Sequence, residues 1–96
     1  MKVELSEAAE GQSLAIDAWW SENRPKAPDL FITELERAIA DLREMPGIGM
    51  KYSLGAAGVR RLLLPRTQHH LYFVEEVERI VIVAIWSCRR GHGPPL

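Results

Sequence analysis

The spacing of apolar residues changes once along the chain, and this change limits the possible folds more than any other feature. Between residues 30 and 42, apolar residues recur every three or four positions, which predicts an amphipathic helix. After Gly58 the helical spacing is lost, and three stretches, 59–64, 69–75 and 79–86, have the alternating or continuous apolar pattern of strands. The links PRTQ and EEVE are of hairpin length, so we expect these strands to pair as an antiparallel meander.

A short strand and a first helix are expected before this change. The opening KVEL is partly β-branched, and Ser6 is a natural N-cap for a helix over residues 7–23. The sequence NRPKAP ends that helix, and Asp29 favours the start of the next one because its carboxylate complements the helix dipole. Pro46 ends the second helix. The predicted fold is therefore α+β, in the order β-α-α-β-β-β, with two N-terminal helices packed on an antiparallel sheet.

The length and composition of the chain suit one small domain. The 96 residues, 47% hydrophobic and 26% charged, predict a single domain over residues 1–96. Cys88 is the only cysteine, so an internal disulfide and a cysteine-based zinc site are excluded, and we interpret it as structural. We expect no metal or cofactor. No signal-type apolar stretch opens the chain, and the longest apolar run, residues 80–86, is too short to span a membrane. A cytoplasmic protein without a membrane partner is therefore expected.

The two halves of the chain carry opposite charge. Residues 1–48 hold five basic and ten acidic side chains, whereas residues 49–96 hold seven basic and three acidic ones. This asymmetry indicates an anionic partner for one face of the molecule. The net charge of −1 excludes a strongly basic protein that binds nucleic acid indiscriminately.

Two arginines are adjacent in the predicted strand GVRRLLLP. Successive side chains of a strand point to opposite faces, so Arg60 and Arg61 cannot form one patch. A guanidinium group is always protonated, and its planar fork matches a phosphate through two parallel hydrogen bonds. Two interpretations stay open. Either one arginine pairs with an acid such as Glu75 or Glu76 while the other is solvated, or an arginine belongs to an anion site.

A second arginine pair, Arg89 and Arg90, follows the last predicted strand. These side chains are either solvated at the strand end, or they meet the first pair across the end of the sheet and hold an anion. His92 has a suitable ordinary pKa for an acid or a base. The adjacent His69 and His70 point to opposite faces of a strand, and we interpret them as surface or hairpin residues.

Several stretches in a fixed order carry a family resemblance. They are LSEAA at the end of the first strand, WWSENRPKA, FITELERAIADLREMPGIG, GVRRLLLP, HHLYFVEEVERIVIVAIW and the RRG tail. Together they cover nearly the whole chain, and it resembles the RelE/ParE superfamily of toxins from bacterial toxin-antitoxin modules. The sequence GVRRL followed by HHLYFV and an apolar strand ending in Trp is more similar to the ParE branch than to RelE.

This resemblance implies a small toxin that causes growth arrest and is held inactive by a cognate antitoxin. ParE-like members have DNA gyrase as their target, and RelE-like members cut mRNA in the ribosome. The first interpretation is therefore a ParE-like toxin that inhibits gyrase by binding, without catalysis of its own. The C-terminal strand and tail would provide the target-binding residues Arg60, Arg61, Arg89 and Arg90.

The second interpretation is a RelE-like, ribosome-dependent mRNA endonuclease. Metal-free RNA cleavage needs a base, an acid and positive charge beside the phosphate. RelE-like enzymes carry several lysines and a catalytic tyrosine or histidine near the C-terminus. The second half of this chain has only Lys51, and Tyr72 is interpreted as a sheet residue, so catalytic residues stay unassigned. A nuclease would have to use Arg60, Arg61, Arg89, Arg90 and His92. A third interpretation is a degenerate toxin that only binds its antitoxin.

Two adjacent tryptophans mark the expected antitoxin-binding surface. Trp19 and Trp20 lie about 100° apart around a helix, so one face cannot easily bury both. One of them packs in the core and the other at the seam between the helices, or else one contributes to an exposed apolar groove for an antitoxin helix.

Overall fold

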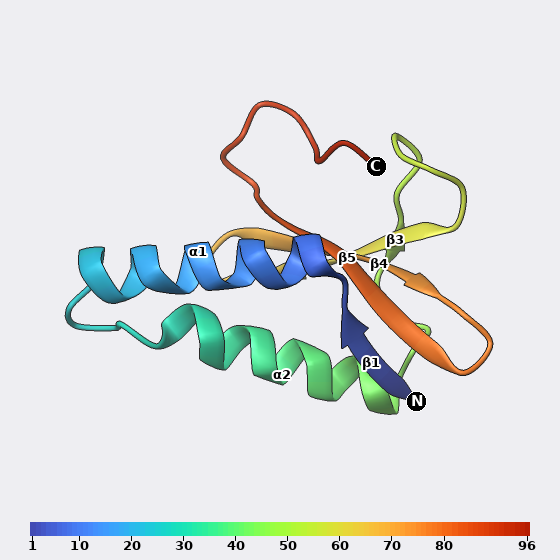
Figure 1. Ribbon diagram of the computed structural model, residues 1–96, viewed down its shortest axis with the longest axis horizontal. Helices are drawn as coiled ribbons and strands as arrows, with labels where there is room; N and C mark the ends of the chain where they lie inside the picture. Colours follow the sequence, from blue (N-terminus) through green and yellow to red (C-terminus); the bar gives the residue numbers. More distant parts are fainter.

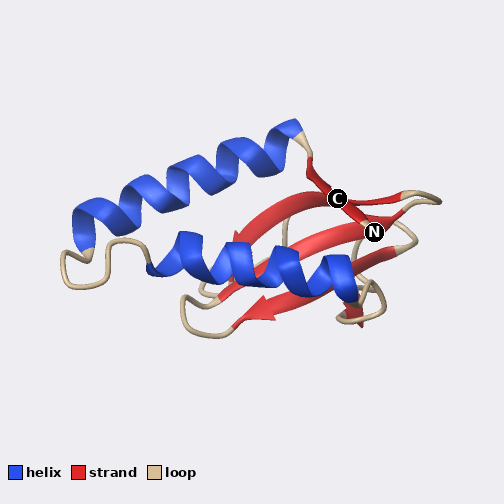
Figure 2. Ribbon diagram, turned by 90° about the horizontal axis from the view of Figure 1, so that it is seen from below, coloured by secondary structure: helices blue, strands red, loops and turns tan.

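The structure has an α+β fold in which two helices cover one face of a five-stranded sheet (Figure 1, Figure 2). It is a computed structural model that describes all 96 residues. The elements in chain order are β1 (Lys2–Leu5), α1 (Glu7–Asn23), α2 (Leu30–Glu44), β2 (Met50–Lys51), β3 (Val59–Leu64), β4 (His69–Glu75) and β5 (Arg79–Ser87). The predicted fold class, the two helices and the meander of three strands are confirmed.

The sheet has the strand order β1-β5-β4-β3-β2 and is mixed. β3, β4 and β5 pair antiparallel through the two expected hairpins. β1 runs parallel to β5, with Lys2 beside Arg79 and Leu5 beside Ile82, so the prediction of a wholly antiparallel sheet is wrong for β1. Parallel neighbours need a long connection, which the intervening chain supplies. The prediction also omits β2, whose two residues are too few to show a period.

Local sequence signals set the start of α1 and its contact with the sheet. Ser6 is the N-cap, as predicted, and its Oγ accepts a hydrogen bond from the backbone N–H of Ala9 at 3.1 Å. The Gln12 Oε1 accepts a hydrogen bond from the backbone N–H of Ile85 at 2.7 Å. This bond satisfies a donor of β5 close to the bulge at Val83, where the β4–β5 register shifts. Neither helix is both long and apolar enough to cross a membrane.

The main core lies between α2 and the sheet. α2 buries the face that its periodicity predicts: Phe31, Leu35, Ala38 and Leu42. These side chains pack against the buried strand residues Leu64, Leu71, Phe73, Ile80, Ile82 and Ile85. Removal of this apolar surface from water is the principal force that holds the helices on the sheet.

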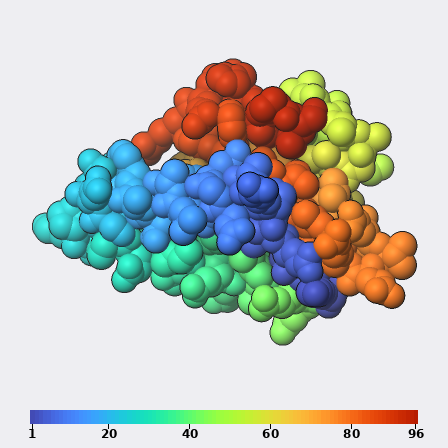
Figure 3. All heavy atoms as spheres, in the orientation of Figure 1, coloured from blue at the N-terminus to red at the C-terminus, as the bar shows by residue number.

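The opposite side of the sheet, which we call the far face, has a smaller apolar cluster of Val59, Tyr72 and Ala84. The connection between β2 and β3 and the end of the tail of residues 88–96 lie on this side, away from the helices (Figure 1). Figure 3 shows their atoms, yellow-green and red, side by side. The indole N–H of Trp86 donates a hydrogen bond to the carbonyl oxygen of His92 at 2.8 Å, which holds the tail close to β5.

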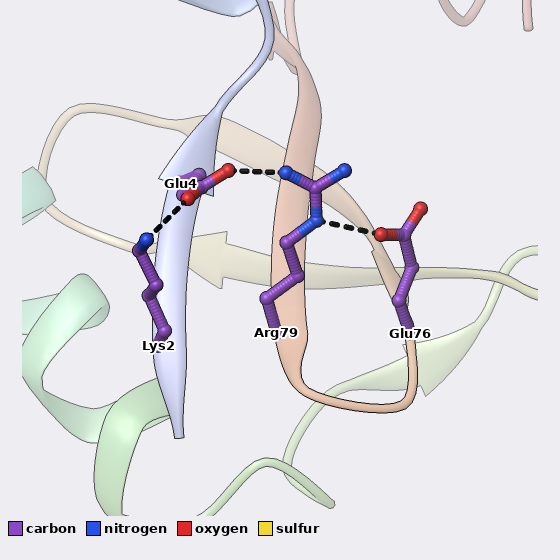
Figure 4. Close-up of polar contacts among 4 residues, drawn as sticks. All are labelled: Lys2, Glu4, Glu76 and Arg79. Atoms are coloured by element: carbon purple, nitrogen blue, oxygen red, sulfur yellow. Dashed lines mark hydrogen bonds and ion pairs between the residues drawn. The ribbon is translucent and has the colours of Figure 1, made fainter.

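Charged side chains link β1 to the start of β5 (Figure 4). Glu4 accepts a hydrogen bond from the ammonium group of Lys2 at 2.9 Å and another from Arg79. Arg79 also donates from Nε to Glu76 at 2.7 Å. The hydrogen bond from Lys2, followed by that from Arg79, lowers the pKa of Glu4. This cluster lies at the end of the sheet away from the tail and uses none of the candidate site residues.

Candidate functional site

Arg60 and Arg61 lie on opposite faces of β3, as strand alternation predicts. The Nη2 of Arg60 donates hydrogen bonds to the carbonyl oxygens of Gly47 at 3.0 Å and Gly49 at 2.8 Å. Both carbonyls belong to the connection between α2 and β2, so Arg60 anchors that connection. The ion pairs of the chain involve Lys2, Arg37 and Arg79 as cations, and the interpretation in which an acid neutralises Arg60 or Arg61 is wrong.

Arg61 and Arg90 line one cavity of about 260 Å³ on the far face. The Cζ of Arg61 lies 5.4 Å from the ring centroid of Tyr52, and the Cζ of Arg90 lies 3.9 Å from that of Trp86. We call this cavity the far-face pocket. Its other lining side chains with functional groups include His70, Tyr72, Cys88 and His92. The structure thus brings together three of the residues predicted from the sequence: Arg61, Arg90 and His92.

Burial changes the acidity of two groups in the far-face pocket. The Nδ1 of His70 lies 3.3 Å from the Sγ of Cys88. Burial lowers the pKa of His70, and the charge of Arg61 lowers it further. Burial raises the pKa of Cys88, although Arg61 acts in the opposite direction. At neutral pH the pocket therefore presents a neutral imidazole and a thiol beside two cations.

Sequence reasoning missed His70 and Tyr72 as pocket residues. A usable signal was present, because His70 and Tyr72 share one face of β4 and Tyr72 is the pairing partner of Arg61. Tyr52 and Cys88 gave no such signal. Both lie just beyond the end of a strand, where alternation no longer fixes the direction of a side chain.

Arg89 lies apart from the first arginine pair. It lines a cavity of about 440 Å³ beside α1, together with Trp19 and Trp20. Arg90 borders both cavities. The four predicted arginines therefore do not form one cluster: Arg61 and Arg90 converge, whereas Arg60 and Arg89 are directed elsewhere.

The two tryptophans differ in exposure. Trp20 is half-buried and packs against the main core, whereas Trp19 is 46% exposed. Their ring centroids are 5.8 Å apart in an edge-to-face arrangement. The guanidinium group of Arg24 lies 4.9 Å from the Trp19 centroid and 5.7 Å from that of Trp20. This arrangement favours the interpretation in which one tryptophan contributes to an exposed surface.

A groove of about 450 Å³ lies between α2 and β3. Its floor includes Ile48 and Leu62, and the neighbouring Leu63 is 46% exposed. β2 pairs only with Arg60 and Arg61, so the outer edge of β3 is open from Leu62 onward. An apolar groove beside an open strand edge can accept a helix or an added strand.

Comparisons with known proteins agree with this architecture. A solved structure described as the chromosomal ParDE TA system from P. aeruginosa is similar, with a TM-score of 0.78 and 20% sequence identity over 91% of this chain and 95% of that chain. At this identity the likeness shows the fold. No curated protein matches the sequence. The family model described as the ParE toxin of the type II toxin-antitoxin system, parDE, matches residues 3–91. The chain therefore belongs to the ParE toxin family of type II toxin-antitoxin systems.

Proposed function

We propose that this chain is a toxin that inhibits DNA gyrase by binding, and that a cognate antitoxin neutralises it. The target-binding surface is the far face around Arg61 and Arg90, including the tail. The observation that carries this proposal is the convergence of these two guanidinium groups in one pocket without an acidic partner. An arginine that is not already paired can form bidentate hydrogen bonds with a carboxylate or phosphate of a target.

The chemistry of the far-face pocket supports binding in preference to catalysis. Its lining has no carboxylate that could orient a histidine or serve as a base. The two guanidinium groups lie over the rings of Tyr52 and Trp86, which hold them in place before a target arrives. A prearranged pair of cations beside aromatic surface is typical of a protein-binding hot spot.

Two surfaces support the proposed antitoxin partnership. Trp19 is exposed next to Trp20, as expected for the antitoxin-binding residues. The groove between α2 and β3, with its exposed Leu63 and open strand edge, suits a segment that is disordered when free. An antitoxin tail bound along this groove would bury apolar surface that otherwise contacts water.

The proposal is tested by adding the purified chain to a gyrase supercoiling reaction. Inhibition is expected, and addition of the protein encoded by a neighbouring antitoxin gene should restore supercoiling. A topoisomerase other than gyrase is the control, and the chain should not affect its activity. Unchanged supercoiling at a stoichiometric excess of the chain would reject gyrase as the target.

One feature of the far-face pocket supports a second candidate, a ribosome-dependent mRNA endonuclease. It places Arg61, Arg90 and His92 together and adds the neutral imidazole of His70, which could accept a proton from a ribose hydroxyl. Incubation of the chain with ribosome-bound message tests this candidate. Cleavage that a His70→Gln variant loses would establish it, whereas intact message would exclude it. Absence of both activities would leave a degenerate toxin that only binds its antitoxin.

A further inference from the structure

A second cavity, on the helix side, is lined by more arginines than the far-face pocket. It has a volume of about 440 Å³ and lies between the end of α1, the β3–β4 hairpin and the start of the tail. Its lining includes Trp19, Trp20, Arg24, Arg66, Arg89 and Arg90. We call it the arginine–tryptophan pocket. The four arginines come from three separate parts of the chain, so the fold and not a run of sequence places them together.

The lining of this pocket includes four arginines and no carboxylate. None of its four arginines takes part in an ion pair. The carboxylate of Glu34 contacts the hairpin, and its two oxygens accept hydrogen bonds from the backbone N–H groups of Arg66 at 2.7 Å and Thr67 at 3.0 Å. The Thr67 hydroxyl donates a third bond to Glu34 at 2.7 Å. Four arginines around one cavity that form no ion pair raise the local potential and favour an anionic ligand.

Apolar surface lies next to this charge. Trp19 is 46% exposed. Arg24 covers part of its ring, because the Cζ of Arg24 lies 4.9 Å from the centroid of the Trp19 ring. Ile16 extends the apolar wall along α1. A ligand that matches the pocket therefore combines acidic groups with an apolar group a short distance away.

The surroundings of the pocket favour a short acidic segment over a nucleic acid. α1 has no basic residue and carries Glu7, Glu10, Asp17 and Glu22. A nucleic acid strand that continued past the pocket along α1 would meet these like charges, and the net charge of the chain is −1. A peptide with a few acidic residues need contact only the pocket itself.

We propose that the arginine–tryptophan pocket binds an acidic segment of a protein partner, with its carboxylates on Arg24, Arg66 and Arg89 and a flanking apolar side chain on Trp19. The inference deepens the antitoxin part of the proposed function, on which the identity of that partner rests. It assigns the antitoxin a segment rich in Asp or Glu next to an apolar residue. It does not depend on the nature of the toxin's target.

Fluorescence anisotropy with labelled synthetic peptides tests this inference. One peptide combines glutamates with leucines, and its counterpart has glutamine at each glutamate. The full chain should bind the acidic peptide, and salt should weaken binding because screening reduces charge attraction. The neutral counterpart should bind at least about tenfold more weakly, a difference that corresponds to about 1.4 kcal/mol. Equal binding of the two peptides would overturn the proposal.

Variants locate the binding to the pocket. The triple variant Arg24→Gln, Arg66→Gln, Arg89→Gln should lose at least about tenfold in affinity for the acidic peptide. The matched control Lys26→Gln, Arg43→Gln, Lys51→Gln removes the same charge from exposed positions outside the pocket and should bind like the parent chain. If the triple variant does not fold, Trp19→Ala with the single change Arg89→Gln gives the same test.

A labelled single-stranded oligonucleotide is the competing probe. Tighter binding of the oligonucleotide than of the acidic peptide, with the same dependence on the three arginines, would replace this proposal by a nucleic acid site. Supercoiling assays on the same preparations separate the two proposals. If the chain inhibits gyrase but binds the acidic and neutral peptides equally, and the triple variant binds like the parent chain, this inference alone is refuted. If the chain binds the acidic peptide but does not affect gyrase, only the proposed target is refuted.

Discussion

Replacement of Glu34 by alanine is expected to destabilise the chain by about 2–4 kcal/mol. Glu34 lies on α2 and accepts three hydrogen bonds from the β3–β4 hairpin, one from Arg66 and two from Thr67. The backbone N–H of Arg66 is at an exposed residue, so water can replace its lost acceptor at little cost. Thr67 is 6% exposed, and its N–H would be left buried without a partner, which costs about 1–3 kcal/mol.

The Thr67 hydroxyl contributes a smaller part of the loss. It can turn toward the Nδ1 of His69, 3.1 Å away, and its net loss is then about 0.5–1.5 kcal/mol. Glu34→Gln should be intermediate, because the amide keeps one acceptor but presents N–H groups to a backbone donor. For a domain of this size, a loss of about 2–4 kcal/mol lowers the melting temperature by roughly 10–30 °C.

Urea denaturation followed by circular dichroism measures this loss. The midpoint should move to lower urea with an unchanged slope, since the surface exposed on unfolding is nearly the same. Glu36→Ala, at an exposed position of the same helix with no hydrogen bond or ion pair, is the control and should stay within about 0.5 kcal/mol of the parent chain. A Glu34→Ala variant as stable as the control would refute the assignment of Glu34 as the main tie between α2 and the hairpin.

Three further predictions follow from single features of the structure. Gly49→Ala should lower the free energy of unfolding by about 2–4 kcal/mol, measured by thermal unfolding, because Gly49 has φ +94° and an added Cβ would lie 2.9 Å from the carbonyl oxygen of Arg61. A variant as stable as the parent chain would contradict this prediction. Iodoacetamide should alkylate Cys88 at pH 7.5 more slowly than free cysteine because its pKa is raised, and Arg61→Gln should slow the reaction further; a faster reaction would show that the thiol is exposed. Burial lowers the pKa values of His69 and His70 in the folded chain. As the pH drops through the ordinary value of about 6.5, the unfolded chain therefore binds more protons than the folded chain. The unfolding free energy should therefore fall as pH drops from 7 through that value, and the His69→Gln, His70→Gln variant should show a shallower slope.

The sequence predicts the elements well wherever a local signal repeats. The period of α2 and the capping geometry of Ser6 are local, and both agree with the structure. The direction of β1 is not local, since KVEL has the same pattern whether it pairs parallel or antiparallel. Its parallel pairing with β5 depends on where the intervening helices return the chain. The two-residue β2 has no period to detect.

The candidate site was predictable only where strand alternation controls it. Alternation correctly separates Arg60 from Arg61, and the register of β3 with β4 could have added His70 and Tyr72. The positions of Arg89 and Arg90 depend on the path of the tail. Hydrogen bonds from the backbone N–H of Cys88 to the carbonyl oxygen of Gln68 and from the indole of Trp86 to the carbonyl oxygen of His92 hold that path. None of these contacts has a repeating pattern in the sequence.

The central claim is that the two guanidinium groups of the far-face pocket form the target-binding surface. The most direct test measures the protein concentration that halves gyrase supercoiling. It compares three proteins: the parent chain, the double variant with Arg61→Gln and Arg90→Gln, and the control Arg43→Gln. Arg43 is exposed at the end of α2, outside both pockets. The double variant should need at least about tenfold more protein than the parent chain, whereas the control should match it. A folded double variant that inhibits gyrase as strongly as the parent chain would contradict the claim.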